Sequence, residues 1–145
     1  MKKLMILLTA SCLICGIALA GGNGAVQAPL VDREGGAEVG FLVANVAATP
    51  KANIEISVKA GEPDIEYDVW VKINGTNLTW PDDPSATLST NKQGKGNVHV
   101  VITPEDVVGI EIGDTVDITV VVKKPEDEMT SQKGLAGTAE DVVVK

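Results

Sequence analysis

The chain has 145 residues, and its 20 Asp and Glu against 12 Lys and Arg give it a net charge of −8. Its two cysteines, Cys12 and Cys15, lie in an apolar N-terminal segment, so the remaining chain has no sulfur for a disulfide scaffold or a thiolate metal site. The acidic balance disfavours a nucleic-acid partner, because phosphate binding needs a positive face, and a single histidine rules out a multi-histidine metal centre.

The first 20 residues have the pattern of a secretory signal peptide. Two lysines follow Met1, residues 4–17 form an apolar run, and residues 18–20 (ALA) supply small side chains at a cleavage position. We expect residues 1–20 to be removed, which leaves a mature chain of 125 residues with a net charge of −10. Two alternatives stay open: an N-terminal transmembrane anchor, and lipidation at Cys12. The predicted localisation is secreted, periplasmic or cell surface, with no membrane insertion after cleavage.

Residues 21–38 are rich in glycine and show no sustained periodicity. This composition predicts a flexible N-terminal arm, in which residues 26–31 offer a loosely pairing segment. From residue 39 onward the pattern changes to an alternation of apolar and polar residues. We therefore expect residues 39–145 to form one domain.

The alternation is characteristic of half-buried β-strands, whose successive side chains point to opposite faces. It occurs in four segments of the domain, which are residues 53–59, 65–73, 98–102 and 116–123. In each segment the apolar residues fall on one face and most polar residues on the other. No window of the mature chain shows a convincing helical period.

Turn residues separate these segments at short intervals. Residues 91–97 (NKQGKGN) predict a hairpin connection, residues 124–139 a long polar loop, and residues 141–145 a final short strand. The sequence therefore predicts an all-β fold, an antiparallel β-sandwich of about seven or eight strands. At this level residues 39–123, and residues 67–102 above all, resemble the immunoglobulin-like or fibronectin-type-III-like modules of extracellular proteins, although the Cys-Trp-Cys hallmark of immunoglobulin domains is absent.

Two tryptophans are the candidate binding residues. Trp70 falls on the polar side of its predicted strand, and Trp80 lies in a proline-flanked loop beside Asp82 and Asp83. Exposed tryptophans with nearby acids can stack on sugar rings or anchor a protein partner. The alternative is that each ring covers an end or an edge of the sandwich, since tryptophan is usually largely buried.

The residues for catalysis are sparse. We expect the single histidine, His99, to be a solvated residue on the outer face of its strand, and the mature chain has no nucleophilic cysteine or G-x-S-x-G elbow. A carboxylate pair such as Asp64 with Asp82 is the remaining enzymatic candidate. Calcium ligation by Glu62, Asp64, Asp82 and Asp83 stays open, but no EF-hand spacing supports it, so neither a metal nor a cofactor is predicted.

These patterns favour an exported, non-catalytic module of the cell envelope or extracellular space, with a structural or protein-binding role. Its expected partner is an envelope or extracellular protein or a glycan. The alternative function is a carbohydrate-binding module that uses Trp70 and Trp80.

Overall fold

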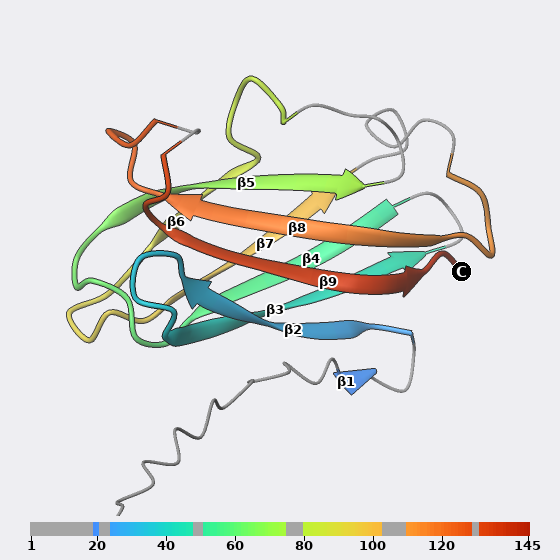
Figure 1. The fold of residues 1–145 in the computed structure, drawn as a ribbon, viewed down its shortest axis with the longest axis horizontal. Helices are drawn as coiled ribbons and strands as arrows, with labels where there is room; N and C mark the ends of the chain where they lie inside the picture. Colours follow the sequence, from blue (N-terminus) through green and yellow to red (C-terminus); the bar gives the residue numbers. More distant parts are fainter. Residues whose placement is uncertain (1–18, 21–23, 48–50, 75–79, 103–109, 129–130) are drawn as a thin grey trace, which may run out of the picture.

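The computed structural model describes residues 19–20, 24–47, 51–74, 80–102, 110–128 and 131–145. Within these ranges the chain forms strands and turns, and no helix is long and apolar enough to cross a membrane. The strands are β1 (Leu19–Ala20), β2 (Val26–Asp32), β3 (Glu38–Ala47), β4 (Lys51–Val58), β5 (Glu66–Asn74), β6 (Ala86–Ser89), β7 (Gly96–Ile102), β8 (Thr115–Lys123) and β9 (Leu135–Val143) (Figure 1). Residues 1–18 of the expected signal peptide lie outside the described residues, so export stays a prediction.

Eight of these strands form one antiparallel sheet in the order β6-β5-β8-β9-β2-β3-β4-β7, and β1 pairs with β2 off this path. The sheet curls into a nearly closed, flattened barrel, with β5, β8 and β9 on one side of Figure 1 and β3, β4 and β7 behind them. The consecutive strands β4 and β5 are not neighbours, nor are β7 and β8, so both connections cross between the two halves of the sheet. The predicted antiparallel all-β fold of about seven or eight strands is confirmed.

The interior is lined by the apolar residues of the alternating segments, as predicted. On β5 the buried residues are Tyr67, Val69, Val71 and Ile73, and the same period holds on β4 and β8. Fully burying one such aliphatic side chain contributes about 1.5–3 kcal/mol, so a slip of one residue, which would turn a whole row outward, is strongly disfavoured. The core cluster contains aliphatic residues and Tyr67, and neither tryptophan belongs to it.

Strand β2 differs from the sequence prediction. The segment expected to lie in a flexible arm contains β2, whose Val26, Ala28 and Leu30 are buried and whose residues 26–31 pair with β3. The prediction rested on the glycines on either side of this segment, and the strand also contains Pro29, which lacks a ladder donor and is normally confined to sheet edges. Here the Pro29 carbonyl faces Gly137 of β9, on the side where β2 and β9 are paired at only two positions, so the missing donor interrupts no ladder.

The last strand is also longer than predicted. Residues 124–139 were expected to form a loop, but β9 begins at Leu135. Its alternation is hidden because small residues fill the middle of the strand, and because a bulge opposite Asp117 shifts the register. At this bulge Asp141 has a φ of 54°, and its backbone N–H donates to the Asp117 carboxylate at 3.0 Å.

Residues 91–97 connect β6 to β7, but the two strands do not pair as a hairpin, so that part of the prediction is wrong. β6 pairs with β5, and β7 pairs with β4. They approach each other only beside the loop, where a Cβ on Gly96 would collide with the Ser89 carbonyl. Beyond this point β6 follows β5 and β7 follows β4, which leaves the barrel open between β6 and β7.

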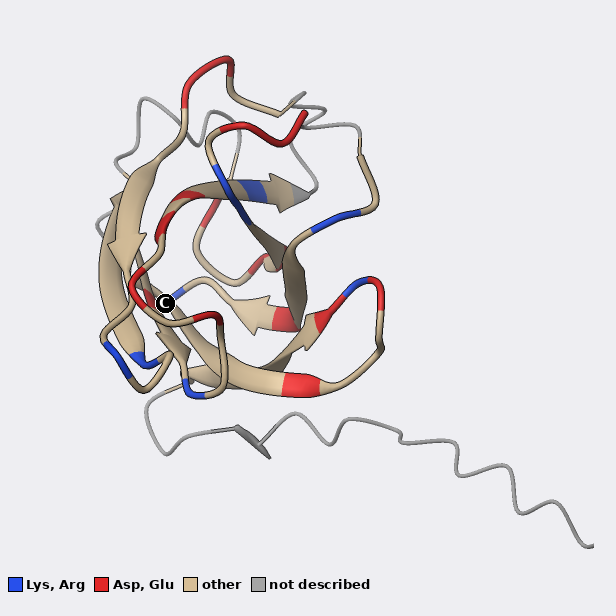
Figure 2. Cartoon of the chain, turned by 90° about the vertical axis from the view of Figure 1, so that its left-hand side faces the viewer, with Lys and Arg blue, Asp and Glu red and all other residues tan. Residues whose placement is uncertain are grey.

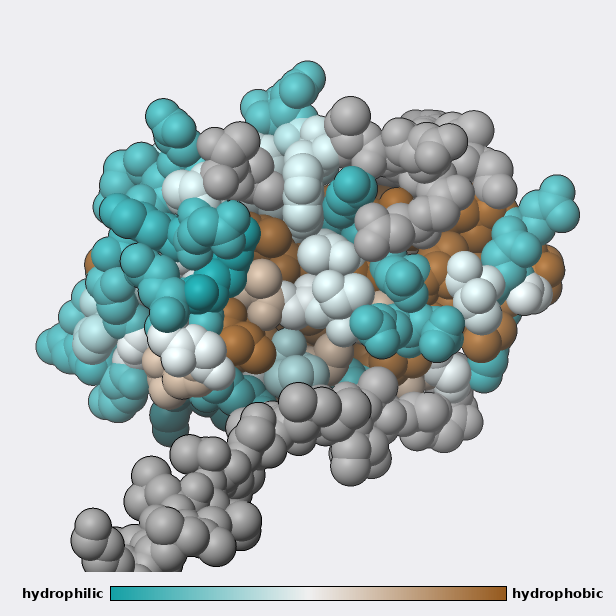
Figure 3. Space-filling view, in the orientation of Figure 1, coloured by the Kyte–Doolittle hydropathy of each residue, from teal (hydrophilic) through white to brown (hydrophobic). Residues whose placement is uncertain are grey.

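Hydrophilic side chains gather at one end of the barrel. Figure 3 shows them over the left-hand end, where the loops after β2, β4 and β8 lie in Figure 1, while apolar side chains show toward the other end. Ile112 and Val143, near the C-terminus, are 70% and 40% exposed. We call the hydrophilic end, with the turn 33–37 and the loops 59–65, 90–95 and 124–134, the loop end.

Two loops at this end are joined through backbone contacts. The Gly61 N–H donates to the Gly94 carbonyl at 2.9 Å, and the Asp64 N–H donates to the Asn91 carbonyl at 3.1 Å. Thr90 adds a hydroxyl bond of 2.6 Å to the Glu62 carbonyl. The β6–β7 connection therefore fixes the β4–β5 crossover.

Replacing Gly94 with alanine is expected to break this junction. Gly94 has a φ of 71°, and a Cβ there would collide with the Gly61 carbonyl, whereas Gly36 has the same φ with nothing within 4 Å. Both substitutions carry a left-handed backbone cost of about 1–2 kcal/mol, and Gly94→Ala adds about 1–3 kcal/mol for overpacking. Chemical unfolding of the two variants measures this difference, and equal losses would contradict the packing described.

Candidate functional site

The outward row of β5 carries the first predicted site residue. Because Tyr67, Val69 and Val71 face the core, Trp70 and Lys72 face out, and both are half-buried. Trp70 lies directly opposite Val121 of β8, which is only 4% exposed although it is not part of the interior cluster. Trp70 therefore covers part of the outer sheet face as well as presenting a surface to solvent.

The second tryptophan lies over the same strand. The Lys72 ammonium is 5.8 Å from the centre of the Trp80 ring, within the range of a cation–π contact. Five residues later, Ser85 is fixed to β5, since its N–H donates to the Val69 carbonyl at 2.8 Å and its hydroxyl accepts from the Val71 N–H at 3.4 Å. The loop from residue 80 to 85 is thus attached to β5 at both ends.

This loop carries the two remaining predicted residues. Asp82 and Asp83 are exposed between the attachments at Trp80 and Ser85. The fold therefore brings the four predicted residues to one side of β5, together with Lys72, which the sequence analysis did not select. We call Trp70, Lys72, Trp80, Asp82 and Asp83 the tryptophan face.

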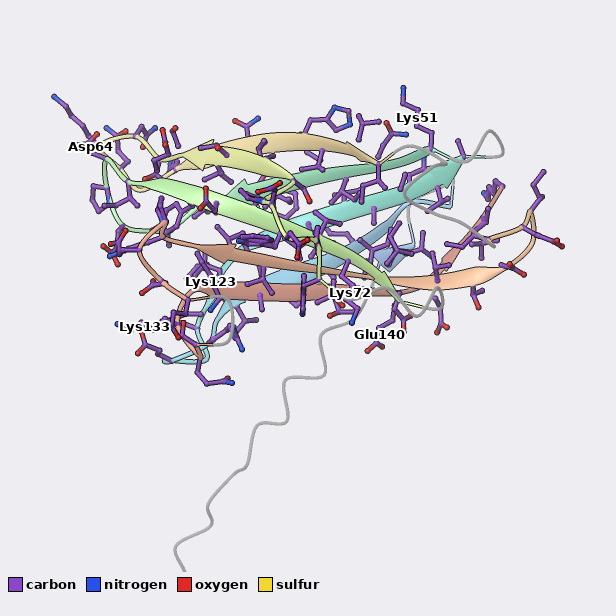
Figure 4. All side chains as sticks on the ribbon, turned by 90° about the horizontal axis from the view of Figure 1, so that it is seen from above. Lys51, Asp64, Lys72, Lys123, Lys133 and Glu140 are labelled. Carbon is purple, nitrogen blue, oxygen red and sulfur yellow. The ribbon has the colours of Figure 1, made fainter. Side chains whose placement is uncertain are left out.

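The carboxylates around the tryptophan face outnumber its cation. Glu66 is exposed and Asp68 half-buried in the same outward row of β5, next to Trp70. With Asp82 and Asp83 they make four acids, against Lys72 and against Lys123 of β8, which lies opposite Asp68. Figure 4 shows Glu140 of β9 on the same side of the barrel as Lys72. The face has a negative local charge.

The four carboxylates considered for calcium do not converge. Glu62 and Asp64 precede β5 at the loop end, whereas Asp82 and Asp83 precede β6, which runs antiparallel to β5 with Ala86 opposite Val69. Figure 4 shows Asp64 at the loop end and Lys72 farther along the barrel. A catalytic acid and base must flank one substrate, so the same separation argues against Asp64 and Asp82 as such a pair. In the described part of the chain, no group of three or more His, Cys, Asp or Glu could hold a metal ion.

His99 is exposed on the outer face of β7, opposite Glu55 of β4. The prediction of an outward-facing strand histidine is confirmed.

A polar cleft at the loop end was not predicted. Its volume is about 690 Å³, and it lies between the turn after β2, the β4–β5 loop and the β8–β9 loop. The charged residues that line it are Asp32, Glu34, Glu62, Lys124, Glu126, Asp127 and Lys133. Figure 2 looks onto this end and shows acidic segments along its loops. Because these residues come from segments far apart in the sequence, no local pattern could have indicated the cleft.

One wall of the cleft is held by a buried lysine. Lys123 is only 1% exposed, and its ammonium donates to the Glu128 carbonyl at 2.8 Å, the Ser131 carbonyl at 2.6 Å and the Ser131 hydroxyl at 2.9 Å. Arg33 donates to the same Ser131 carbonyl at 3.1 Å. The loop 124–134 is thereby folded over the outer face of β8 and fastened to the turn after β2.

Burial shifts the pKa of two groups here. Removing the Lys123 ammonium from water lowers its pKa, and the nearby Arg33 charge lowers it further. Burial raises the pKa of Tyr67, although its phenolic oxygen accepts a hydrogen bond from the Glu62 N–H at 3.3 Å. The neighbouring Lys124 has a raised pKa because it forms a 2.8 Å ion pair with Glu62.

No protein-family model and no curated protein sequence matches the chain. Among solved structures, it is similar to a single-substitution variant of a SOD-like protein from Bacillus subtilis, with 15% identity, a TM-score of 0.47, and coverage of 80% of this chain and 97% of that chain. A double-substitution variant of a SOD-like protein from the same organism gives 15% identity, a TM-score of 0.48, and coverage of 79% and 95%. A similarity this remote does not transfer an activity to this chain. The sequence resemblance to immunoglobulin-like modules holds at the coarser level of an antiparallel all-β fold.

Replacing the buried ammonium should cost far more stability than replacing its exposed neighbour. Lys123→Met leaves the Glu128 carbonyl without its Lys123 donor and the Ser131 carbonyl with Arg33 alone, so we expect a loss of about 1–3 kcal/mol in the free energy of unfolding. Lys124→Met removes an ion pair that solvent screens, and should change stability little. Denaturant unfolding of both variants tests this, and similar losses at the two adjacent positions would contradict the assignment.

Tyr67 is the only tyrosine in the chain, so phenolate absorbance reports its titration directly. The folded protein should titrate above the ordinary pKa of 10.0, and the denatured chain near it. Because the folded state then holds the proton more tightly, stability should fall as pH rises from 10.0 to the folded pKa, and Tyr67→Phe should remove that part of the loss. A folded-state titration at or below 10.0 would contradict the burial of the hydroxyl.

Proposed function

We propose that this protein is an exported, non-catalytic module of the cell envelope or extracellular space, and that it binds another protein through the tryptophan face. In this role it would resemble the immunoglobulin-like modules whose pattern its sequence shares. Export is supported by the leader sequence alone, and binding is supported by the arrangement of side chains around β5.

The observation that carries the proposal is the position of the two tryptophans. The core is complete without them, since neither is part of the interior cluster, yet both lie on one side of a single strand. Tryptophan is enriched among the residues that dominate protein interfaces, where its large rigid surface is buried at little entropic cost. Half-exposed rings on a firmly attached strand and loop are suited to that use.

Carbohydrate binding is the second candidate. Aromatic rings can stack on sugars, and the exposed carboxylates of Asp82 and Asp83 can accept hydrogen bonds from sugar hydroxyls. This candidate uses the same residues, so the experiment must identify what is bound.

Site-specific photocrosslinking in the producing cell can identify it. A photoreactive residue at Asp83 should capture one recurrent protein, whereas the same residue at Glu34, which is also exposed but lies at the loop end, should not. Trp80→Ala should abolish the capture. Phe41→Ala, which removes another outer-face ring with a lysine 4.7 Å from its centre, should leave it intact.

Equal capture from Glu34, or capture that survives Trp80→Ala, would contradict the proposed protein-binding role of this face. Retention on a glycan that Trp80→Ala abolishes, with no protein captured from Asp83, would establish the carbohydrate-binding alternative in its place.

A further inference from the structure

We infer that the partner of the tryptophan face is a basic protein segment, whose Arg or Lys side chains stack on the half-exposed rings and pair with the surrounding carboxylates. This inference rests on the proposed function, because it names the chemistry of the partner for the same surface.

The charge of the face is the first observation. Asp68 is next to Trp70 in the outward row of β5, Glu66 is one position farther, and Asp82 and Asp83 follow Trp80; within the described residues none of the four forms a salt bridge. Asp68 lies opposite Lys123 of β8, whose ammonium donates to the Glu128 and Ser131 carbonyls, so the excess negative charge of the face rests mainly on the other three acids. A positively charged partner is attracted by these carboxylates, whereas an acidic partner would place like charges together. The net charge of the whole chain, −8, acts in the same direction at longer range.

The contact between Lys72 and Trp80 is the second observation. A ring whose face already receives an ammonium at 5.8 Å is oriented to receive a cation, and arginine binds tryptophan faces at least as well as lysine does. Lys72 is thus an internal competitor for the partner's cation. The effect of replacing Lys72 on binding affinity therefore has an expected direction. Removing Lys72 should strengthen binding of a basic segment and weaken binding of an acidic ligand.

The chain itself provides the readout. Trp70 and Trp80 are its only tryptophans, so intrinsic fluorescence reports on this face alone. The probe is a blocked peptide of alternating Arg and Gly, titrated into the purified exported protein. A peptide of alternating Glu and Gly is the charge control.

The basic peptide should change tryptophan emission saturably, and the effect should weaken as salt is raised. Lys72→Met should tighten its binding, whereas Lys59→Met, which removes an equal charge and an equivalent contact with Phe41, should not. The double variant Asp82→Asn with Asp83→Asn should weaken binding by about fivefold, from the loss of two exposed pairings. Glu34→Gln with Glu126→Gln, an equal change of net charge at the loop end, should have a smaller effect.

A stronger response to the acidic peptide, or weaker binding of the basic peptide after Lys72→Met, would overturn the inference. Equal weakening by the two double variants would also overturn it, because it would mean that only net charge is sensed. A protein captured at Asp83 whose binding improves in the Asp82→Asn, Asp83→Asn variant would overturn the basic partner and leave the proposed function standing.

Discussion

The inward row of β5 is the constraint on which the candidate site depends. Tyr67, Val69, Val71 and Ile73 fill one side of the barrel interior, and a strand has only two faces. The residues between them must therefore face out, which places Trp70 and Lys72 side by side along the strand. Ser85 then fastens the following loop to the backbone of β5, so that Trp80 lies over Lys72. The surface arrangement is thus a consequence of how the core is packed.

The loop end is organised by a different kind of interaction. There the connections are held by polar groups that meet across long sequence separations, above all by the Lys123 and Arg33 donors that share the Ser131 carbonyl. A buried ammonium is costly unless its donors are used, and the Lys123 ammonium donates to three oxygens of Glu128 and Ser131 in one loop. The outer face of β8 is therefore covered at Lys123 by this loop, and at Val121, the next outward residue, it is buried opposite Trp70.

The sequence predicted those parts of the fold that follow from local alternation. The inward rows of β4, β5, β7 and β8, the outward position of His99 and the all-β class needed no tertiary information. β2 was predicted only as a loosely pairing segment because glycines stand on both sides of it, and the start of β9 was missed because glycine, alanine and threonine mask the alternation. The pairing of β6 with β5 depends on the closure of the barrel, and the burial of Lys123 depends on a loop that folds back. Neither leaves a local signal. The four site residues were selected on residue type. Lys72 could not be selected in this way, because its place in the site depends on the contact with Trp80.

Selective quenching of tryptophan fluorescence tests the central claim most directly, because it needs no partner. Caesium and iodide ions would be titrated into the purified protein, each quenching constant being expressed relative to that of free N-acetyltryptophanamide. If the rings are exposed among carboxylates, the relative constant should be higher for caesium than for iodide, and the difference should shrink as inert salt is added. A relative constant that is equal or higher for iodide, or rings inaccessible to both ions, would contradict an exposed, negatively charged tryptophan face.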